Sequence, residues 1–266
     1  MRVLKALVAL TQGNYDIAAT NAIAARAGFP LMTNAEMLSG FNNAANQEWM
    51  WGSTQILDQS TFFSSFFALN SSNFSSSNIR TQPRSINGTL WEAIPATDIR
   101  KQLWDSRTST TAIIPAGGVR VPYHNKKFLA AGEANSIGDV VYMRAAEMYL
   151  IEAEARARQG GAQEAAARTA LNILLANRNP TGAPTTATGQ ALIDQILFNR
   201  RIELWGEGFR FIDLKRLDLP LDRSGIPNRS VALDLASTII PAGDIRWQFL
   251  FPQDEINANK LIVQNP

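Results

Sequence analysis

The stretch Asn199–Arg216 constrains the fold more than any other part of the sequence. It carries eight charged side chains of both signs among aromatic and aliphatic residues, on what the spacing predicts to be one helix and its exit. An unpaired charge is costly to bury, so charges set this densely beside apolar residues must be paired or solvated. The stretch is therefore either a candidate active site or an internal lock that holds the scaffold together.

Two carboxylates favour the active site, and the arginines around them favour the lock. If the helix continues, Glu203 and Glu207 share a face, where paired carboxylates can perform acid–base chemistry or hydrolyse a glycoside. Nearby arginines would hold these acids ionised, which does not suit a general acid. The neutralising residues that we expect are Arg200, Arg201, Arg210 and Arg216. We predict a structural lock, with a glycoside hydrolase using Glu203 and Glu207 as the alternative.

Composition excludes several functional classes. The chain has 266 residues, enough for one large domain or two small ones, and its formal net charge of +2 is too small to indicate a nucleic-acid partner. It has no cysteine and a single histidine, His124, which excludes thiolate and multi-histidine metal sites. We expect no metal and no cofactor, and we expect His124 to lie in an exposed loop. No apolar stretch is long enough to span a membrane.

Helical periodicity appears in two separate parts of the chain. Residues 2–12 and 15–27 predict one helical hairpin, with small residues on one face of its second helix. A second hairpin is predicted from Met143 to about Pro180, broken at Gly160-Gly161, because apolar residues recur at steps of three and four. The hairpins resemble tetratricopeptide units but are too far apart for a simple solenoid. The predicted fold class is mostly α, with tetratricopeptide-like hairpins, long irregular loops and a few short strands.

Residues 40–138 differ in character, with aromatic, serine and asparagine residues predominating. The segment Asn70–Asn78 has neither helical nor strand periodicity and predicts an exposed loop. Trp49 and Trp51 would share a face if they lie on a strand. Near the end of the chain, partial alternation over 246–252 favours a short strand.

Four ordered motifs resemble the SusD/RagB family of outer-membrane nutrient-binding lipoproteins. The charged stretch fits the family's signature through Arg200, Glu203, Leu204, Glu207, Gly208, Arg210, Asp213, Leu214 and Arg216. Residues 143–155, with Arg144 and Glu147, resemble a helix of the family, 97–100 its Asp-x-Arg element, and 251–266 its C-terminal motif. Family members are longer and begin with a signal peptide and a lipidated cysteine. The chain resembles their C-terminal half, so we expect residues 1–266 to form a single SusD-like C-terminal domain from a longer protein, with an aromatic insertion at about 40–138.

The resemblance implies a function without catalysis. SusD-like proteins bind oligosaccharide or other nutrients at the outer-membrane surface and deliver them to a SusC-like TonB-dependent transporter. Membrane contact would occur only through a lipid anchor that this chain does not contain. In that family the charged signature belongs to the scaffold, which agrees with a lock. A tetratricopeptide-like protein that docks a partner is a further alternative.

Ligand binding is then expected in the aromatic region, on a rigid helical platform. Flat aromatic faces can stack on sugar rings, and planar polar groups can bind hydroxyls. Core packing is the commoner role of a tryptophan. The predicted ligand-binding residues are Trp51, Asn73, Phe74, Asn78, Arg80, Arg84, Trp91 and Trp104.

Overall fold

The computed structural model describes residues 1–59, 63–132, 135–227 and 239–265. These residues form eleven α-helices, several 3-10 turns and two sheets of two strands each, so the predicted fold class is confirmed. Contacts divide the chain into two compact units, Met1–Glu207 and Gly208–Pro266. None of the helices in the described ranges is long and apolar enough to cross a membrane.

The first unit begins with the predicted helical hairpin. Helix α1 spans Arg2–Thr11 and helix α2 spans Tyr15–Ala25. Their contact is made largely by alanines, including Ala6 on α1 and Ala18 on α2, and neither residue is exposed at all. Side chains this small let the two backbones approach closely, which the sequence analysis had predicted for α2.

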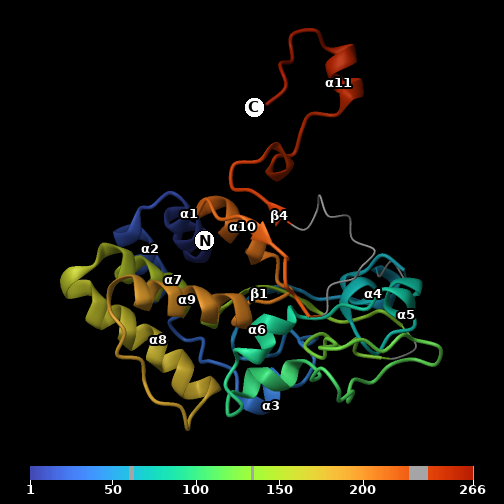
Figure 1. Cartoon of the computed structure of the whole chain (residues 1–266), viewed down its shortest axis with the longest axis horizontal. Helices are drawn as coiled ribbons and strands as arrows, with labels where there is room; N and C mark the ends of the chain where they lie inside the picture. The colour runs from blue at the N-terminus through green and yellow to red at the C-terminus, as the bar shows by residue number, and fades with distance from the viewer. Residues whose placement is uncertain (60–62, 133–134, 228–238, 266) are drawn as a thin grey trace. The chain divides into compact units, whose positions relative to one another are not determined.

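The second predicted hairpin is also present and lies directly against the first. Helix α7 spans Ala145–Gln159 and helix α8 spans Glu164–Arg178, joined by the 3-10 turn η3 (Gly161–Gln163). Helix α7 contacts α1, α2, α8 and also α9 (Gly189–Glu203), and these helices lie together in Figure 1. The hairpins therefore stack through α2 and α7, although residues 26–144 separate them in the chain.

Helix α7 begins later than the sequence analysis predicted. Met143 belongs to strand β2 (Val140–Arg144), which pairs antiparallel with β1 (Trp49–Ser53). Apolar residues such as Met143 are compatible with a helix or a strand. Here the backbone of residues 140–144 forms hydrogen bonds to β1, so the segment is a strand. The register of β1 shifts between Trp49 and Trp51. As a result, Trp49 is 7% exposed and Trp51 is 57% exposed, so the two do not share one environment.

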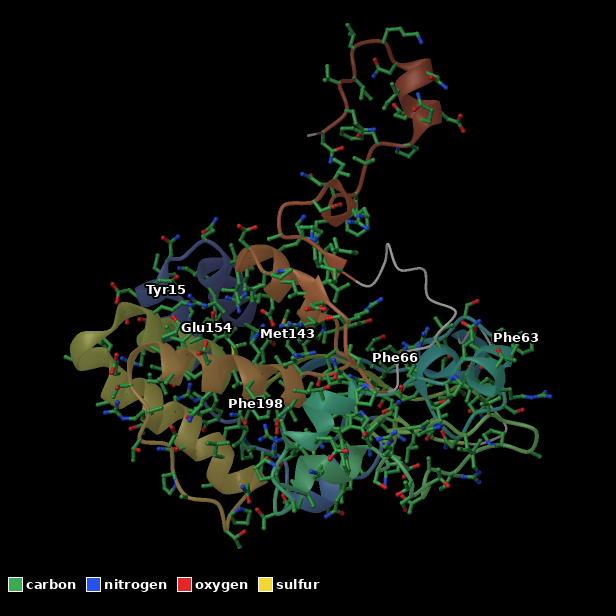
Figure 2. The ribbon with its side chains drawn as sticks, viewed as in Figure 1. Tyr15, Phe63, Phe66, Met143, Glu154 and Phe198 are labelled. Atoms are coloured by element: carbon green, nitrogen blue, oxygen red, sulfur yellow. The ribbon has the colours of Figure 1, made fainter. Side chains whose placement is uncertain are left out.

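The aromatic segment between the hairpins builds a core of its own. Phe41, Phe67 and Phe128 lie at its centre, and Phe66 and Phe198 (Figure 2) pack against it. The short elements around this core are α3 (Asn34–Met37), η1 (Leu57–Gln59), α4 (Phe66–Asn70), α5 (Ser77–Thr81), α6 (Gly88–Glu92) and η2 (Ile99–Leu103).

The expectation of an exposed loop at Asn70–Asn78 is wrong. Ser71, Asn73 and Ser76 are buried because their side chains bond to the main chain. The Ser71 hydroxyl donates to the carbonyl of Phe67 at 2.6 Å, and that of Ser76 to the carbonyl of Ala68 at 2.7 Å. Asn73 donates to the carbonyl of Ala130 and accepts from its N–H, at 2.9 and 2.7 Å. A buried polar group costs little when it is bonded in this way.

The charged stretch Asn199–Arg216, predicted to be one helix and its exit, contains the end of one helix and the whole of another, and the second unit starts between them. Helix α9 ends at Glu203, and α10 (Phe209–Arg216) begins after a turn in which Gly206 and Gly208 have φ values of 77° and 90°. The expected strand at 246–252 is also absent, because Asp244 caps the 3-10 turn η5 (Ile245–Trp247) by accepting from the Arg246 N–H. The unit further contains β3 (Leu221–Asp222) paired with β4 (Ile239–Ile240), and α11 (Gln253–Ala258).

We predict that Gly206→Ala destabilises the first unit by about 3 kcal/mol, combining the strain of a left-handed conformation with a steric clash. A Cβ atom at Gly206 would lie 2.4 Å from the buried Phe128 ring. Gly28→Ala is the matched control, since its φ is 86° and no atom lies within 4 Å of its added Cβ. It should cost only about 1 kcal/mol. Urea denaturation followed by circular dichroism measures both, and equal losses would contradict the proposed clash.

Candidate functional site

A cluster of paired charges is buried inside the first unit. Its members, which we call the buried ion cluster, are Glu48, Asp98, Arg100, Lys127, Arg144, Arg178, Glu203 and Glu207. Glu203, the last residue of α9, has a fully buried side chain. It binds Arg144 at 2.7 Å, Arg178 at 3.0 Å and Arg100 at 3.3 Å.

Glu48 and Glu207 extend the cluster in two directions. Glu48 binds Arg144 at 2.7 Å and Arg178 at 2.9 Å, so both arginines bridge it to Glu203. Glu207 binds Arg144 at 2.9 Å and the Lys127 ammonium at 2.5 Å. Each charge thus meets an opposite charge, which is the condition under which burial is tolerated.

These pairs set the protonation of the two candidate catalytic acids. Burial raises the pKa of Glu203, but the charges of Arg178, Arg144 and Arg100 outweigh it and hold that pKa well below 4.5. Burial likewise raises the pKa of Glu207, and Arg144 and Lys127 lower it below 4.5. Burial lowers the pKa of Lys127 to about 8, partly offset by Glu207. Two ionised and enclosed carboxylates are suited to holding arginines, and not to donating a proton.

The ion pairs described for Glu203 and Glu207 involve cations from outside the charged stretch. The described ion pairs reach Arg100, Lys127, Arg144 and Arg178, which precede the charged stretch in the chain. Arg100 and Arg144 belong to motifs described above, but no motif or spacing in the sequence indicated that Arg178 would bind Glu203. Among the other signature residues, Glu147 and Arg200 are buried in the first unit. In the second unit, Arg216 pairs with Asp213 at 2.8 Å. Burial lowers the pKa of Arg210, and the charge of Asp213 offsets this only in part.

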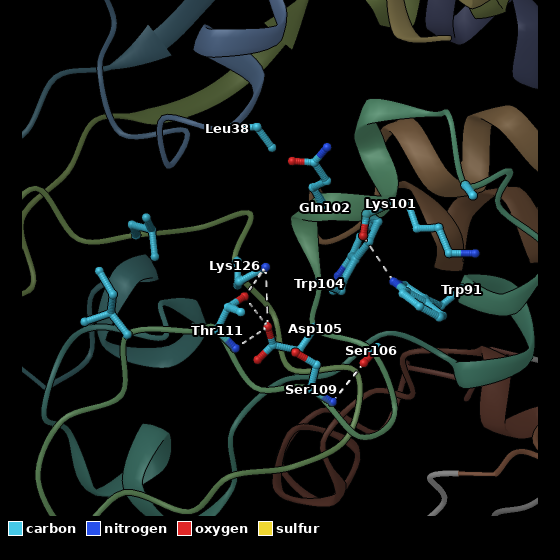
Figure 3. Close-up of a pocket in the computed structure, with 13 residues that line it drawn as sticks. Leu38, Trp91, Lys101, Gln102, Trp104, Asp105, Ser106, Ser109, Thr111 and Lys126 are labelled. Atoms are coloured by element: carbon cyan, nitrogen blue, oxygen red, sulfur yellow. Dashed lines mark hydrogen bonds and ion pairs between the residues drawn. The ribbon is translucent and has the colours of Figure 1, made fainter. Parts of the chain in front are cut away.

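A cleft of about 570 Å³ opens elsewhere on the first unit (Figure 3). We call it the cleft; its lining residues are Leu38, Trp91, Ala96, Lys101, Gln102, Trp104, Asp105, Ser106, Ser109, Thr111, Ile113, Lys126 and Leu129. Two backbone segments that contribute lining residues are joined by main-chain bonds. The backbone N–H of Asp105 donates to the His124 carbonyl at 2.9 Å, and that of Lys126 donates to the Leu103 carbonyl at 2.8 Å.

Asp105 organises one wall of the cleft. It accepts from the N–H and hydroxyl of Thr111 at 2.8 and 2.7 Å, and from the Ala112 N–H at 3.1 Å. Lys126 lies 3.3 Å from the same carboxylate. Burial raises the pKa of Asp105, but these bonds and Lys126 lower it overall, so the group is ionised. It fixes the loop that carries Ser106 and Ser109.

Trp91 and Lys101 form the other side of the cleft. The indole N–H of Trp91 donates to the Lys101 carbonyl at 3.1 Å, and the Lys101 ammonium lies 4.2 Å from the centre of the Trp91 ring. Trp91 also contacts Tyr123, with ring centroids 5.4 Å apart. Neighbours therefore occupy much of the Trp91 ring surface.

The structure brings only two of the predicted ligand-binding residues, Trp91 and Trp104, to the cleft. Trp104 is 2% exposed and packs edge-on against Trp205, so it offers little surface. Phe74 and Asn73 lie in the interior, 1% and 8% exposed, and contribute to the core and to the bonds described above. We do not retain either as a ligand contact. The remaining predictions, Trp51, Asn78, Arg80 and Arg84, lie outside the set that lines the cleft.

Trp51 nevertheless presents an open aromatic surface. It pairs with the exposed Tyr142 across β1 and β2, with ring centroids 5.1 Å apart. Its role in ligand binding stays a prediction. Sequence reasoning missed the polar cleft residues Gln102, Ser106, Ser109 and Lys126, because nothing in their spacing distinguishes them from other loop residues.

The expectation of an exposed His124 is wrong. His124 is 1% exposed, and its backbone forms an isolated antiparallel β-bridge with Ser85. The residue is therefore buried and does not lie in an exposed loop. Burial lowers the pKa of His124 below 6.5, Asp105 raises it and Arg120 lowers it further. The side chain is therefore neutral near pH 7. Within the described residues, no group of acidic, histidine or cysteine side chains could hold a metal ion.

The mostly helical scaffold of stacked hairpins is a fold that solved structures share. The SusD family model matches residues 86–266. This is more than half of the chain, which therefore belongs to the SusD family. No curated protein matches it.

Several solved structures are similar over nearly the whole chain. A SusD-like carbohydrate-binding protein from Bacteroides vulgatus is 26% identical with a TM-score of 0.80, covering 97% of this chain and 57% of that one. A SusD superfamily protein from Bacteroides thetaiotaomicron is 25% identical with a TM-score of 0.80, covering 100% and 59%. Surface glycan-binding protein A from Bacteroides uniformis is 18% identical with a TM-score of 0.68, covering 99% and 60%, and shows the fold alone. The chain thus spans less than two thirds of the length of these relatives.

We predict that Glu203→Gln lowers the free energy of unfolding by about 3–5 kcal/mol, because it leaves three buried guanidinium groups short of one negative charge. Glu164→Gln is the matched control. Its carboxylate lies 3.8 Å from Arg168 near the surface, so its loss should change stability by about 0.5 kcal/mol or less. Urea titrations of both variants test this, and an unchanged midpoint for Glu203→Gln would rule out the lock.

Acidification should weaken the same cluster. Glu203 and Glu207 have pKa values below 4.5 in the folded chain, so the stability that they contribute is present above 4.5. It is lost as the pH falls from there through the folded pKa values, because the unfolded chain takes up protons first. We expect a shallower loss in Glu203→Gln than in the wild type. Urea midpoints measured down to pH about 3 test this, and parallel curves would contradict it.

Proposed function

We propose that this chain binds oligosaccharides in the cleft without hydrolysing them. The observation that carries the proposal is the family match over residues 86–266, which includes every cleft residue except Leu38. A relative with 26% identity is described as a carbohydrate-binding protein, and a more distant one as a glycan-binding protein.

The composition of the cleft supports this ligand. Gln102, Ser106 and Ser109 offer groups that donate and accept hydrogen bonds, as sugar hydroxyls require. Leu38, Ile113 and Leu129 supply apolar surface for the hydrogen-bearing faces of the rings. A concave, partly apolar site with a few convergent polar groups is the usual form of a small-ligand site.

Catalysis by Glu203 and Glu207 is the alternative that the geometry disfavours. Both acids are enclosed with arginine or lysine partners, and neither lines the cleft. A glycosidase needs one carboxylic acid that can donate a proton to the leaving group. The pKa directions of these residues are opposite to that need.

We further propose that the protein acts at the bacterial outer-membrane surface and passes its ligand to a SusC-like TonB-dependent transporter. Membership of the SusD family supports this assignment. In this arrangement the helical hairpins are the scaffold and the cleft is the capturing site. Docking of a partner through the hairpins, as in tetratricopeptide proteins, would accompany ligand capture.

We predict that the double variant Gln102→Ala/Ser109→Ala weakens glycan binding about tenfold or more, because it removes hydrogen bonds from the cleft while sparing the core. Trp51→Ala is the comparison variant that tests the rival site, since Trp51 lies on β1 and does not line the cleft. Calorimetry against a panel of neutral and acidic oligosaccharides gives the measurement.

Two outcomes would contradict the assignment. Loss of binding in Trp51→Ala with retention in the double variant would move the site to the exposed aromatic pair. Absence of binding to every glycan of the panel, or release of reducing ends by the wild type, would argue against non-catalytic glycan capture altogether.

A further inference from the structure

The polar groups of the cleft are unequally balanced between donors and acceptors. Asp105 is the one carboxylate among the described residues that line it. Its first oxygen accepts two bonds from Thr111 and lies 3.3 Å from the Lys126 ammonium, and its second accepts from Ala112. The Asp105 carboxylate is therefore largely occupied by hydrogen bonds within the protein, and little of its capacity to accept bonds remains for a ligand.

Two lysines in the cleft keep donor capacity. An ammonium has three N–H groups. That of Lys126 donates to the Thr111 hydroxyl at 2.7 Å and pairs with Asp105, which leaves one N–H. The Lys101 ammonium donates to the Ile94 carbonyl at 2.6 Å, which leaves two of its N–H groups. None of the ion pairs in the described parts of the chain includes Lys101. Both side chains are partly exposed.

The position of Lys101 also limits what can stack on Trp91. Its ammonium lies over the indole ring at 4.2 Å, a favourable arrangement for a cation and an aromatic face. A neutral sugar ring would have to displace this charge before it could stack there. A ligand with an anionic group can instead bind the ammonium where it lies.

The residues that line the cleft thus include two lysines with N–H groups to spare and one carboxylate that is already bonded. Figure 3 shows Lys101 and Lys126 on opposite sides of Trp104. We propose that the cleft selects acidic glycans, whose carboxylate or sulfate groups bind Lys101 and Lys126. This specificity rests on the proposed function, because it names the class of glycan that the same cleft captures.

The test compares ligands that differ only in charge. Probes are an oligogalacturonide, its methyl ester, and a sulfated galactan oligosaccharide with its desulfated form. Calorimetry with the full chain should show binding of the two anionic probes, weakened by salt, and much weaker binding of the uncharged forms. A preference for one anionic probe over the other identifies the acid group as carboxylate or sulfate.

Charge-removing variants locate the selectivity. Lys101→Met and Lys126→Met keep an apolar chain of similar length, and each should weaken binding of the preferred acidic probe about tenfold by removing a charge-assisted contact. Lys126→Arg should restore most of the affinity, which a loss of packing around Asp105 would not allow. Lys215→Met is the matched control, since Lys215 lies 5.7 Å from the centre of the Phe211 ring in the second unit.

The possible outcomes distinguish the proposed specificity for acidic glycans from the proposed binding of glycans in general. Equal binding of charged and uncharged probes, or full affinity in both methionine variants, would overturn the acidic specificity while leaving glycan capture in place. Binding of no probe here and of no glycan in the wider panel would overturn both.

Discussion

The fold depends on the enclosure of one carboxylate, that of Glu203, by three guanidinium groups. Each arginine comes from the end of an element or from a short turn: Arg100 from η2, Arg144 from the junction of β2 and α7, and Arg178 from the last residue of α8. The α7–α8 hairpin, helix α9 and the segment that carries η2 meet at this point. A buried ion cluster adds little net stability compared with apolar packing, but it penalises any arrangement in which one charge loses its partner. It therefore specifies how the parts fit together.

Sequence reasoning recovered the features that repeat with a helical period. The alanine-rich helices and the break at Gly160 were predicted, because small residues at helical spacing and a glycine pair act locally. The partners of Glu203 were not, since an ion pair between residues far apart in the chain leaves no local pattern. The misplaced start of α7 has a related cause, because Met143 fits a strand as well as a helix and only pairing with β1 decides between them.

The candidate cleft was harder to predict from the sequence than the scaffold. A serine- and asparagine-rich segment has the composition of a surface loop, and only its bonds to distant carbonyls, such as that from Asn73 to Ala130, allow it to be buried. Burial of this segment also removes Phe74 from the surface. Aromatic residues in such a region divide between core and cleft according to tertiary contacts, so Trp91 and Trp104 reached the cleft while the polar residues beside them carried no recognisable signal.

The span of the buried ion cluster along the chain bears on how the molecule assembles. Glu48 and Arg178 are separated by 130 positions, and Arg100 and Glu203 by 103. Contacts this distant in sequence carry a larger loop-closure entropy than local contacts. The α1–α2 and α7–α8 hairpins are held by contacts between neighbouring parts of the chain, whereas the cluster joins residues more than 100 positions apart. Interactions made after the folding barrier mainly govern the rate of unfolding, so a cluster that forms at that stage prolongs the lifetime of the native state.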